Sequence, residues 1–270
     1  MQILMFSKML KNVGGLSVEK SAEEISAMGF DGVDLTVRPG GHVLPENVKK
    51  ELPEAVRIIK SKGITVPMIT TSIVDAEADY SEEIFATAEE CGVDYLKLGY
   101  WHYEGFGKIR SQIDFVRKKL DGIEKLCQKY DVCAGIHIHS GDFVSASAAV
   151  VSMLLDGFDP DHLGAYIDPG HMTVEGGKSL WKIGMDLLSN RIKMVAVKDF
   201  GWFDEGDKKW TSKLVPLDQG MVRWNEVFRY LNQIGFDGCV SIHSEYHGLD
   251  IDELLEQTKK DLAYLKKLLD

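Results

Sequence analysis

Imidazole, carboxylate and ammonium groups recur at alternate positions in a few short apolar runs of this 270-residue sequence. The groups are His137, His139, Asp168, Lys198, His243 and Glu245. Imidazole titrates near neutral pH and suits general acid–base catalysis. Imidazole and carboxylate also ligate metal ions, and an ammonium can stabilise an enolate-like oxyanion. These residue types together predict proton transfer, metal binding or both.

Each of these groups has a catalytic interpretation and a structural one. His243 and His137 are the candidate acid and base, or else hydrogen-bonded polar core residues. Asp168 is predicted to ligate a metal or to orient a neighbouring imidazole; the alternative is a cap at the end of a strand. Lys198 stabilises an oxyanion or neutralises a carboxylate, or forms an internal ion pair with Asp168 or Glu245.

Further polar and aromatic residues fall in segments that follow the apolar runs. Arginine suits a carboxylate, a phosphate or a polyol, and aromatic faces stack on sugar rings or form a lid. The candidate substrate-binding residues are Arg38, His42, Trp101, His139, His171, Glu175 and Trp202. Seven of the eight histidines lie at these run ends or in the following loops, which favours a chemical site over scattered core histidines.

The elements that must position these groups alternate between β-rich runs and segments with helical periodicity. The β-rich runs are 3–6, 32–37, 66–71, 95–101, 133–139, 163–168, 192–199 and 239–246. Eight β–α units predict an α/β fold, a single (β/α)₈ TIM barrel over residues 1–270, rather than an open sheet. The first run is followed by SKMLKNVGG (7–15), which lacks the glycine-rich phosphate loop of open doubly wound folds. The long segment 200–223 is a candidate lid.

Alternation along each run predicts which side chains point into the barrel. In YLKLGYW (95–101), Leu96 and Leu98 take the helix side, so Lys97 points inward. The same argument turns inward Asp34, Thr36, Arg38, His137, His139, Tyr166, Asp168, Lys198, Ser241, His243 and Glu245. The polar groups therefore converge on the C-terminal mouth, where the active sites of such barrels lie.

Composition limits the partners. The chain has 31 Lys and Arg against 42 Asp and Glu, a net charge of -11, which disfavours a broad nucleic-acid surface but not a small anionic substrate. No apolar run is long enough for a membrane span, and MQILMFSKML (1–10) indicates a first strand rather than a signal peptide. The four cysteines are far apart and predict free thiols. We expect a cytoplasmic protein with a small-molecule carbohydrate substrate, no nucleic acid and no membrane partner; the oligomeric state stays open.

Several motifs in this order resemble one family over essentially the whole chain. The motifs are GFDGVDL (29–35), GIHIHSG (135–141), YIDPGH (166–171), VAVKD (195–199), PLDQGMVRW (216–224) and VSIHSEY (240–246). The chain resembles the xylose isomerase-like TIM barrels, which include sugar isomerases, sugar-phosphate epimerases, inosose and dehydroshikimate dehydratases and an endonuclease branch. The resemblance implies one divalent metal held by Glu, Asp, His and Glu on strands five to eight. The two glutamates would move a proton beside a carbonyl.

The sequence departs from that ligand set. Matched by motif, His137 and His243 replace the two glutamates, Asp168 is kept, and Ala196 stands where the family has histidine. A His137–Asp168–His243 set suits Zn²⁺ or a similar ion better than Mg²⁺, with water or His139 completing the shell. The alternative is no metal, with the chain's own cationic side chains supplying positive charge.

The resemblance implies a sugar, keto-sugar or polyol isomerase or epimerase that acts by proton transfer next to a carbonyl. Glu245 would then take over from a lost carboxylate base, or only pair with Lys198 or Arg38. The alternatives are a lyase or dehydratase on a similar sugar or inosose-type substrate, and a degenerate sugar-binding barrel. A phosphodiesterase or DNA-repair enzyme needs several metal ligands and a basic groove, which this sequence does not show.

Overall fold

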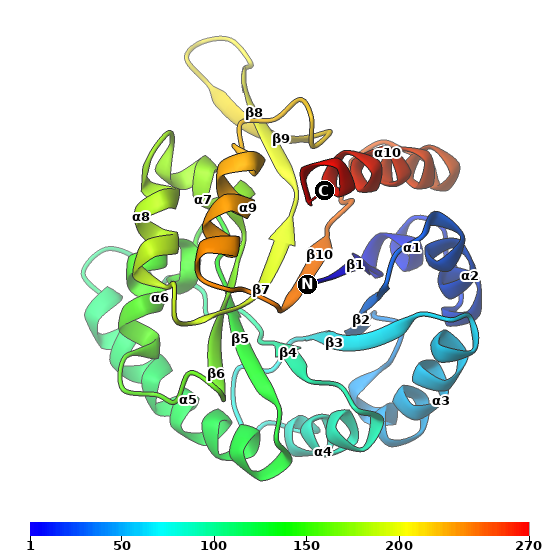
Figure 1. Ribbon diagram of the computed structural model, residues 1–270. Coiled ribbons are helices and arrows are strands. Elements are labelled where there is room, and N and C mark those ends of the chain that lie inside the picture. Colours follow the sequence, from blue (N-terminus) through cyan, green and yellow to red (C-terminus); the bar gives the residue numbers. More distant parts are fainter. Residues whose placement is uncertain (270) are drawn as a thin grey trace.

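Eight parallel strands close into a barrel in the computed structural model, which describes residues 1–269 (Figure 1). The barrel strands are β1 (Gln2–Phe6), β2 (Gly32–Val37), β3 (Thr65–Thr71), β4 (Tyr95–Lys97), β5 (Cys133–His137), β6 (Leu163–Ile167), β7 (Ile192–Val197) and β10 (Cys239–Ile242). Their order around the barrel is β1-β10-β7-β6-β5-β4-β3-β2, so every strand has a neighbour on both sides. The predicted (β/α)₈ fold is confirmed.

Helices surround the barrel as an outer ring (Figure 1). The α-helices are α1 (Lys8–Asn12), α2 (Val18–Met28), α3 (Val48–Ser61), α4 (Ser81–Cys91), α5 (Ile109–Tyr130), α6 (Ala148–Leu155), α7 (Pro169–Gly176), α8 (Leu180–Leu187), α9 (Trp224–Gln233) and α10 (Ile251–Leu269); η1 (Pro45–Asn47) and η2 (Val144–Ala146) are 3₁₀ turns. In α5, Val116, Leu120, Ile123 and Cys127 form the buried stripe that the helical spacing predicts. Within residues 1–269, none of the helices is long and apolar enough to span a membrane.

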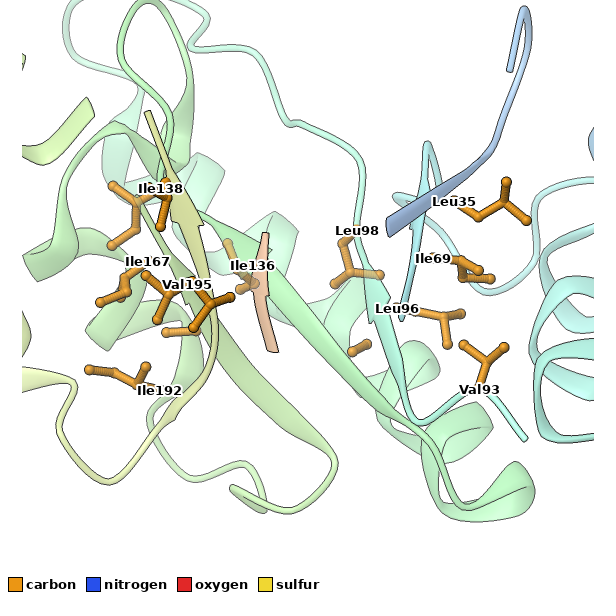
Figure 2. Packing of buried hydrophobic residues seen from close by; sticks show 14 of the residues in the cluster. Leu35, Ile69, Val93, Leu96, Leu98, Ile136, Ile138, Ile167, Ile192 and Val195 are labelled. Carbon is orange, nitrogen blue, oxygen red and sulfur yellow. The ribbon is translucent and has the colours of Figure 1, made fainter. Parts of the chain in front are cut away.

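The two faces of the strands carry different side chains. The outer face is aliphatic and packs beneath the helices, as Figure 2 shows for Leu96, Leu98 and Ile136. A small second core fills the barrel interior and includes Met194, which occupies the space beside Gly135; a Cβ on that glycine would lie 2.1 Å from the Met194 Cε. The polar inward residues lie above this core, so the predicted alternation of faces is confirmed.

Strand β4 is shorter than the run that the sequence suggested. It pairs with β3 and β5 only over residues 95–97, and the chain then leaves the sheet. At Gly99 the backbone passes so close to the loop after β3 that a Cβ would lie 2.5 Å from the Ser72 carbonyl oxygen. The side chains beyond Lys97 are therefore oriented by loop packing and not by strand alternation.

The candidate lid segment contains an antiparallel hairpin, β8 (Asp199–Asp204) and β9 (Trp210–Val215), which extends away from the barrel at the top of Figure 1. Its base is fixed by the buried carboxylate of Asp199. That carboxylate accepts hydrogen bonds from the Met221 and Val222 amides at 2.9 and 3.0 Å and from the Trp224 indole at 2.9 Å. The root of this segment is thus anchored to the barrel.

Candidate active site

A small cavity of about 90 Å³ lies at the C-terminal ends of the strands. It is lined by Phe6, Lys8, Arg38, Thr70, Lys97, Tyr100, His137, His139, Tyr166, Lys198, His243 and Glu245. Four of these side chains are lysine or arginine, three are histidine and one is glutamate. The mouth therefore offers local positive charge despite the net negative charge of the chain.

Lys198 is the centre of the charge distribution in this cavity. Its Nζ lies 3.0 Å from Glu245 Oε2 and 3.4 Å from Asp168 Oδ2, and Lys8 pairs with the other Glu245 oxygen. Burial disfavours the ammonium, but the two carboxylates outweigh it and the pKa of Lys198 lies above its ordinary value. Burial likewise opposes ionisation of Glu245, but Lys198 and His243 hold the pKa of this carboxyl well below its usual range. Both groups are charged at neutral pH.

Asp168 joins this ion pair to two histidines. Its Oδ1 accepts the backbone N–H of His171 at 3.0 Å and so caps α7. Its Oδ2 faces His137 Nε2 at 3.3 Å and His171 Nε2 at 3.7 Å. Asp168 thus caps a helix at the end of strand β6 and also contacts two imidazoles.

His137 is held from both sides. Its Nδ1 lies 2.7 Å from the Tyr100 hydroxyl, and its ring stacks on Tyr166 with centroids 4.5 Å apart. Burial, followed by the nearby Lys198 and Lys97, lowers the pKa of His137 well below its ordinary value. His137 is therefore a neutral imidazole with a fixed orientation.

His243 has one engaged and one free ring nitrogen. Nε2 lies 2.8 Å from the Tyr166 hydroxyl, and the ring stacks on Phe6 with centroids 4.4 Å apart. Nδ1 is buried and has no hydrogen-bond partner among residues 1–269, and it lies 3.7 Å from Glu245 Oε2. When Nε2–H donates to Tyr166, Nδ1 keeps a lone pair that can accept a proton.

The structure brings several predicted substrate-binding residues to this mouth. Arg38 and His139 line the cavity, and the His139 and His171 rings lie 3.8 Å apart between centroids. Glu175 lies farther out, where its carboxylate accepts the Gly141 N–H at 3.0 Å. Arg38 follows strand β2, and the other three residues follow strands β5 and β6.

Three other candidates lie elsewhere. His42 bonds Ser21 on α2 and Thr36 on β2, which makes it a link between helix and strand. Trp101 packs in the aliphatic core, because β4 ends at Lys97 and leaves its direction to the loop. Trp202 is 43% exposed on the hairpin. The geometry gives no support to a substrate-binding role for these three residues.

Six residues of the cavity were not among the sequence candidates, namely Phe6, Lys8, Thr70, Lys97, Tyr100 and Tyr166. Lys97 and Tyr166 were predicted to point inward, so the signal was present in the strand alternation. Lys8 and Tyr100 come from segments after β1 and β4. Their position depends on tertiary packing, and no sequence pattern indicated it.

The predicted metal ligands do not fit a divalent ion in this arrangement. Within residues 1–269, no group of three or more His, Cys, Asp or Glu side chains is placed to hold one. The Asp168 oxygen that faces His137 also faces the Lys198 ammonium, a fixed cation that would repel a divalent ion. His243 turns its Nε2 to Tyr166 instead.

His139 provides a test of the electrostatics of this site. Burial and then Lys198 lower its pKa from 6.5 to about 4, so we expect its ring to stay neutral between pH 8 and 5. Long-range ¹H–¹⁵N spectra of the folded protein should show neutral ring shifts over that range, whereas the urea-unfolded chain should titrate near 6.5. Because the unfolded state then binds more protons, this group makes folding less favourable as the pH falls from 6.5 toward 4. Half-protonation of folded His139 above pH 6 would contradict this assignment.

Known proteins share this architecture. The 3-keto-D-glucoside 4-epimerase of E. coli, in its apo form, aligns with a TM-score of 0.74 at 14% identity over 99% of both chains. A probable 3-DHS dehydratase from Bacillus anthracis aligns with a TM-score of 0.72 at 15% identity, over 97% of this chain and 99% of that one. A magnesium complex of a xylose isomerase-like TIM barrel protein from Mycobacterium smegmatis gives 0.72 at 14%, over 100% and 98%. These similarities concern the fold.

The sequence itself identifies the family. No curated protein matches the chain. The family model described as the xylose isomerase-like TIM barrel matches residues 22–268, which is nearly the whole chain. The chain therefore belongs to the xylose isomerase-like TIM barrel family.

Proposed function

We propose that this protein is an isomerase or epimerase that moves a proton on the carbon next to a carbonyl of a keto-sugar or related polyol. The observation that carries the proposal is the Lys198 ammonium, held between Asp168 and Glu245 beside neutral His137 at the barrel mouth. A cation beside uncharged bases is what enolate chemistry requires, because charge develops on the carbonyl oxygen as the proton leaves. Two fold neighbours, an epimerase and a dehydratase, agree with this type of chemistry.

Different side chains of the site would stabilise the carbonyl oxygen and transfer the proton. Lys198 is the donor to the carbonyl oxygen. His243 accepts the proton through its free Nδ1, and Glu245 Oε2, 3.7 Å away, stabilises the resulting imidazolium. Asp168 orients His137, which serves as the second proton-transfer group.

The charge at the cavity suggests the kind of sugar. Arg38 lines the mouth and, within residues 1–269, forms no salt bridge, whereas Lys8 and Lys198 are paired with Glu245. We expect a substrate with a phosphate or carboxylate group, since guanidinium and ammonium groups suit such anions. A neutral keto-sugar would leave this positive charge unused.

The test is solvent isotope exchange. We expect ²H from ²H₂O to enter the carbon next to the carbonyl in at least one member of a panel of keto-sugars, keto-sugar phosphates and keto-acids, followed by ¹H NMR. Phosphorylated or acidic members should exchange faster than their neutral counterparts. The parent protein after heat unfolding is the control for spontaneous exchange. Absence of exchange across the panel would contradict the proposal.

A dehydratase is the second candidate, because one fold neighbour is a probable dehydratase and the same enolate can expel a leaving group. The two functions are separated in the same spectra. Loss of water yields new vinylic or methylene signals, whereas an isomerase or epimerase yields only exchanged or rearranged sugar. Binding without either change would indicate a sugar-binding barrel.

A further inference from the structure

Lys97 is a buried lysine whose surroundings differ from those of Lys198. It ends strand β4, between the outward Leu96 and Leu98, and its inward side chain lines the cavity (Figure 2 shows the two leucines). The residue is 3% exposed. Its amine therefore reaches the same small space as His137 and His243.

No anion neutralises this amine. Within residues 1–269, Lys97 forms no salt bridge, and its Nζ lies over the Tyr100 ring, 3.5 Å from the centroid. The inward carboxylate of β2, Asp34, instead accepts hydrogen bonds from Thr70 at 2.8 Å and Ser241 at 2.9 Å. Lys198 has two carboxylate partners in the same cavity, so the two lysines are in opposite situations.

These surroundings favour an uncharged amine. Burial, followed by the charge of Arg38, lowers the pKa of Lys97 well below its ordinary value, and the opposing effect of Asp34 is smaller. Desolvation and neighbouring cations are the two ways in which proteins activate a lysine as a nucleophile. Lys97 therefore loses its proton more readily than an ordinary lysine, in a site where we propose that a carbonyl compound binds.

We propose that Lys97 forms an imine with the carbonyl carbon of the substrate, an inference that rests on the proposed function. The amine nitrogen attacks the carbonyl carbon, and a proton moves from nitrogen to oxygen to give a carbinolamine. The carbon–oxygen bond then breaks with a proton supplied by Lys198, water leaves, and a protonated imine remains. Water returns at the end of the cycle to release the product and the free amine.

The imine would perform the task that a metal performs elsewhere in proton transfer next to a carbonyl. Its positive nitrogen accepts the electron pair when the neighbouring carbon loses its proton, and the resulting enamine returns the pair when that carbon is reprotonated. His243 Nδ1 is the free base available for the proton. Imine chemistry needs no metal ion. It therefore suits a site in which the Lys198 ammonium lies beside Asp168 and would repel a divalent ion.

The test is reductive trapping of the full-length protein with 1,3-dihydroxyacetone and cyanoborohydride at neutral pH. A reduced adduct adds the mass of the ketone less one oxygen atom. Modified Lys97 also resists trypsin, which joins residues 63–97 and 98–108 into one peptide. We expect about tenfold or more adduct on Lys97 than on the exposed Lys49, because a pKa one unit lower gives a tenfold larger share of free amine. Lys97→Met should lose this peptide adduct and keep the one on Lys49.

A second reagent tests access to the cavity. Formaldehyde is small enough to reach the amine wherever water can, and it should also modify Lys97 ahead of Lys49. Adduct on Lys97 with both reagents supports the inference. Ketone adduct on Lys97 no greater than on Lys49 would overturn it, whatever formaldehyde does. Isotope exchange in the sugar panel without a Lys97 adduct would leave the proposed function standing and remove the imine. An adduct without exchange would contradict the proposed function and leave Lys97 a reactive amine with no role in proton transfer.

Discussion

Replacement of Lys198 by methionine is expected to lower the free energy of unfolding by about 3–5 kcal/mol at pH 7.5, because breaking a buried ion pair leaves uncompensated charge. Lys198 is 3% exposed and Asp168 is fully buried, so neither carboxylate partner can recover full hydration without rearrangement. Glu245 keeps Lys8 as its second partner, but Asp168 keeps only its imidazole contacts. Guanidinium unfolding of parent and variant, followed by circular dichroism, measures the difference.

The pH dependence of this loss identifies its cause. In the parent, the pKa of Glu245 lies well below 4.5, so its contribution to stability is complete above that pH and disappears as the pH falls through the folded-state pKa. In Lys198→Met the cation is gone, and burial favours the protonated carboxyl groups at a higher pH. The stability difference between parent and variant should therefore narrow between pH 7.5 and pH 5.

Lys193→Met is the matched control, since Lys193 lies on strand β7 and Lys198 directly follows that strand. Lys193 pairs at 3.2 Å with Asp161, whose side chain is 83% exposed, and such pairs contribute at most about 1 kcal/mol. A Lys198→Met protein that loses no more stability than Lys193→Met would show that the buried cluster is not ionised as described. A loss that is the same at both pH values would show that packing, and not charge, is responsible.

The sequence identified most of the inner wall of this site because strands alternate strictly. Once Ile136 and Ile138 were assigned to the helix side, His137 had to point inward, and the same argument placed Lys198 and His243. The two ion pairs left open for Lys198 both form. Alternation alone could not tell which inward cation would be paired, since that depends on side chains from strands far apart in the sequence.

The loops were less predictable for a physical reason. Tyr100 faces the cavity and Trp101 faces the core, the opposite of what the predicted substrate contact by Trp101 required. The strand ends three residues before Tyr100, and the close passage of Gly99 past Ser72 sets the direction of the chain. His42 was predicted to bind substrate because it belongs to RPGGH. Its ring nitrogens instead form hydrogen bonds with Ser21 and Thr36, which connect a helix to a strand.

His243→Asn is expected to lower turnover by roughly 10²–10⁴-fold on whichever substrate the isotope-exchange panel identifies, the usual contribution of a positioned acid or base. The asparagine amide takes the place of Nδ1 but cannot accept the proton that Nδ1 would take. It does not reach the position of Nε2, which lies 2.8 Å from the Tyr166 hydroxyl, so that contact is lost as well. The reduction should appear in kcat rather than KM, since the proton is transferred only as the transition state forms.

The structural contribution of His243 has to be separated from this effect. The ring stacks on Phe6, so the variant loses some packing, and thermal melts should show whether it still folds like the parent. His42→Asn provides the matched control, because His42 is also a largely buried histidine with hydrogen bonds to neighbouring hydroxyls but lies outside the cavity. It should keep turnover close to that of the parent at any temperature at which it is folded. If His243→Asn melts like the parent and turns over within about threefold of it, a change far below the effect of losing an acid or base, His243 is not the group that moves the proton.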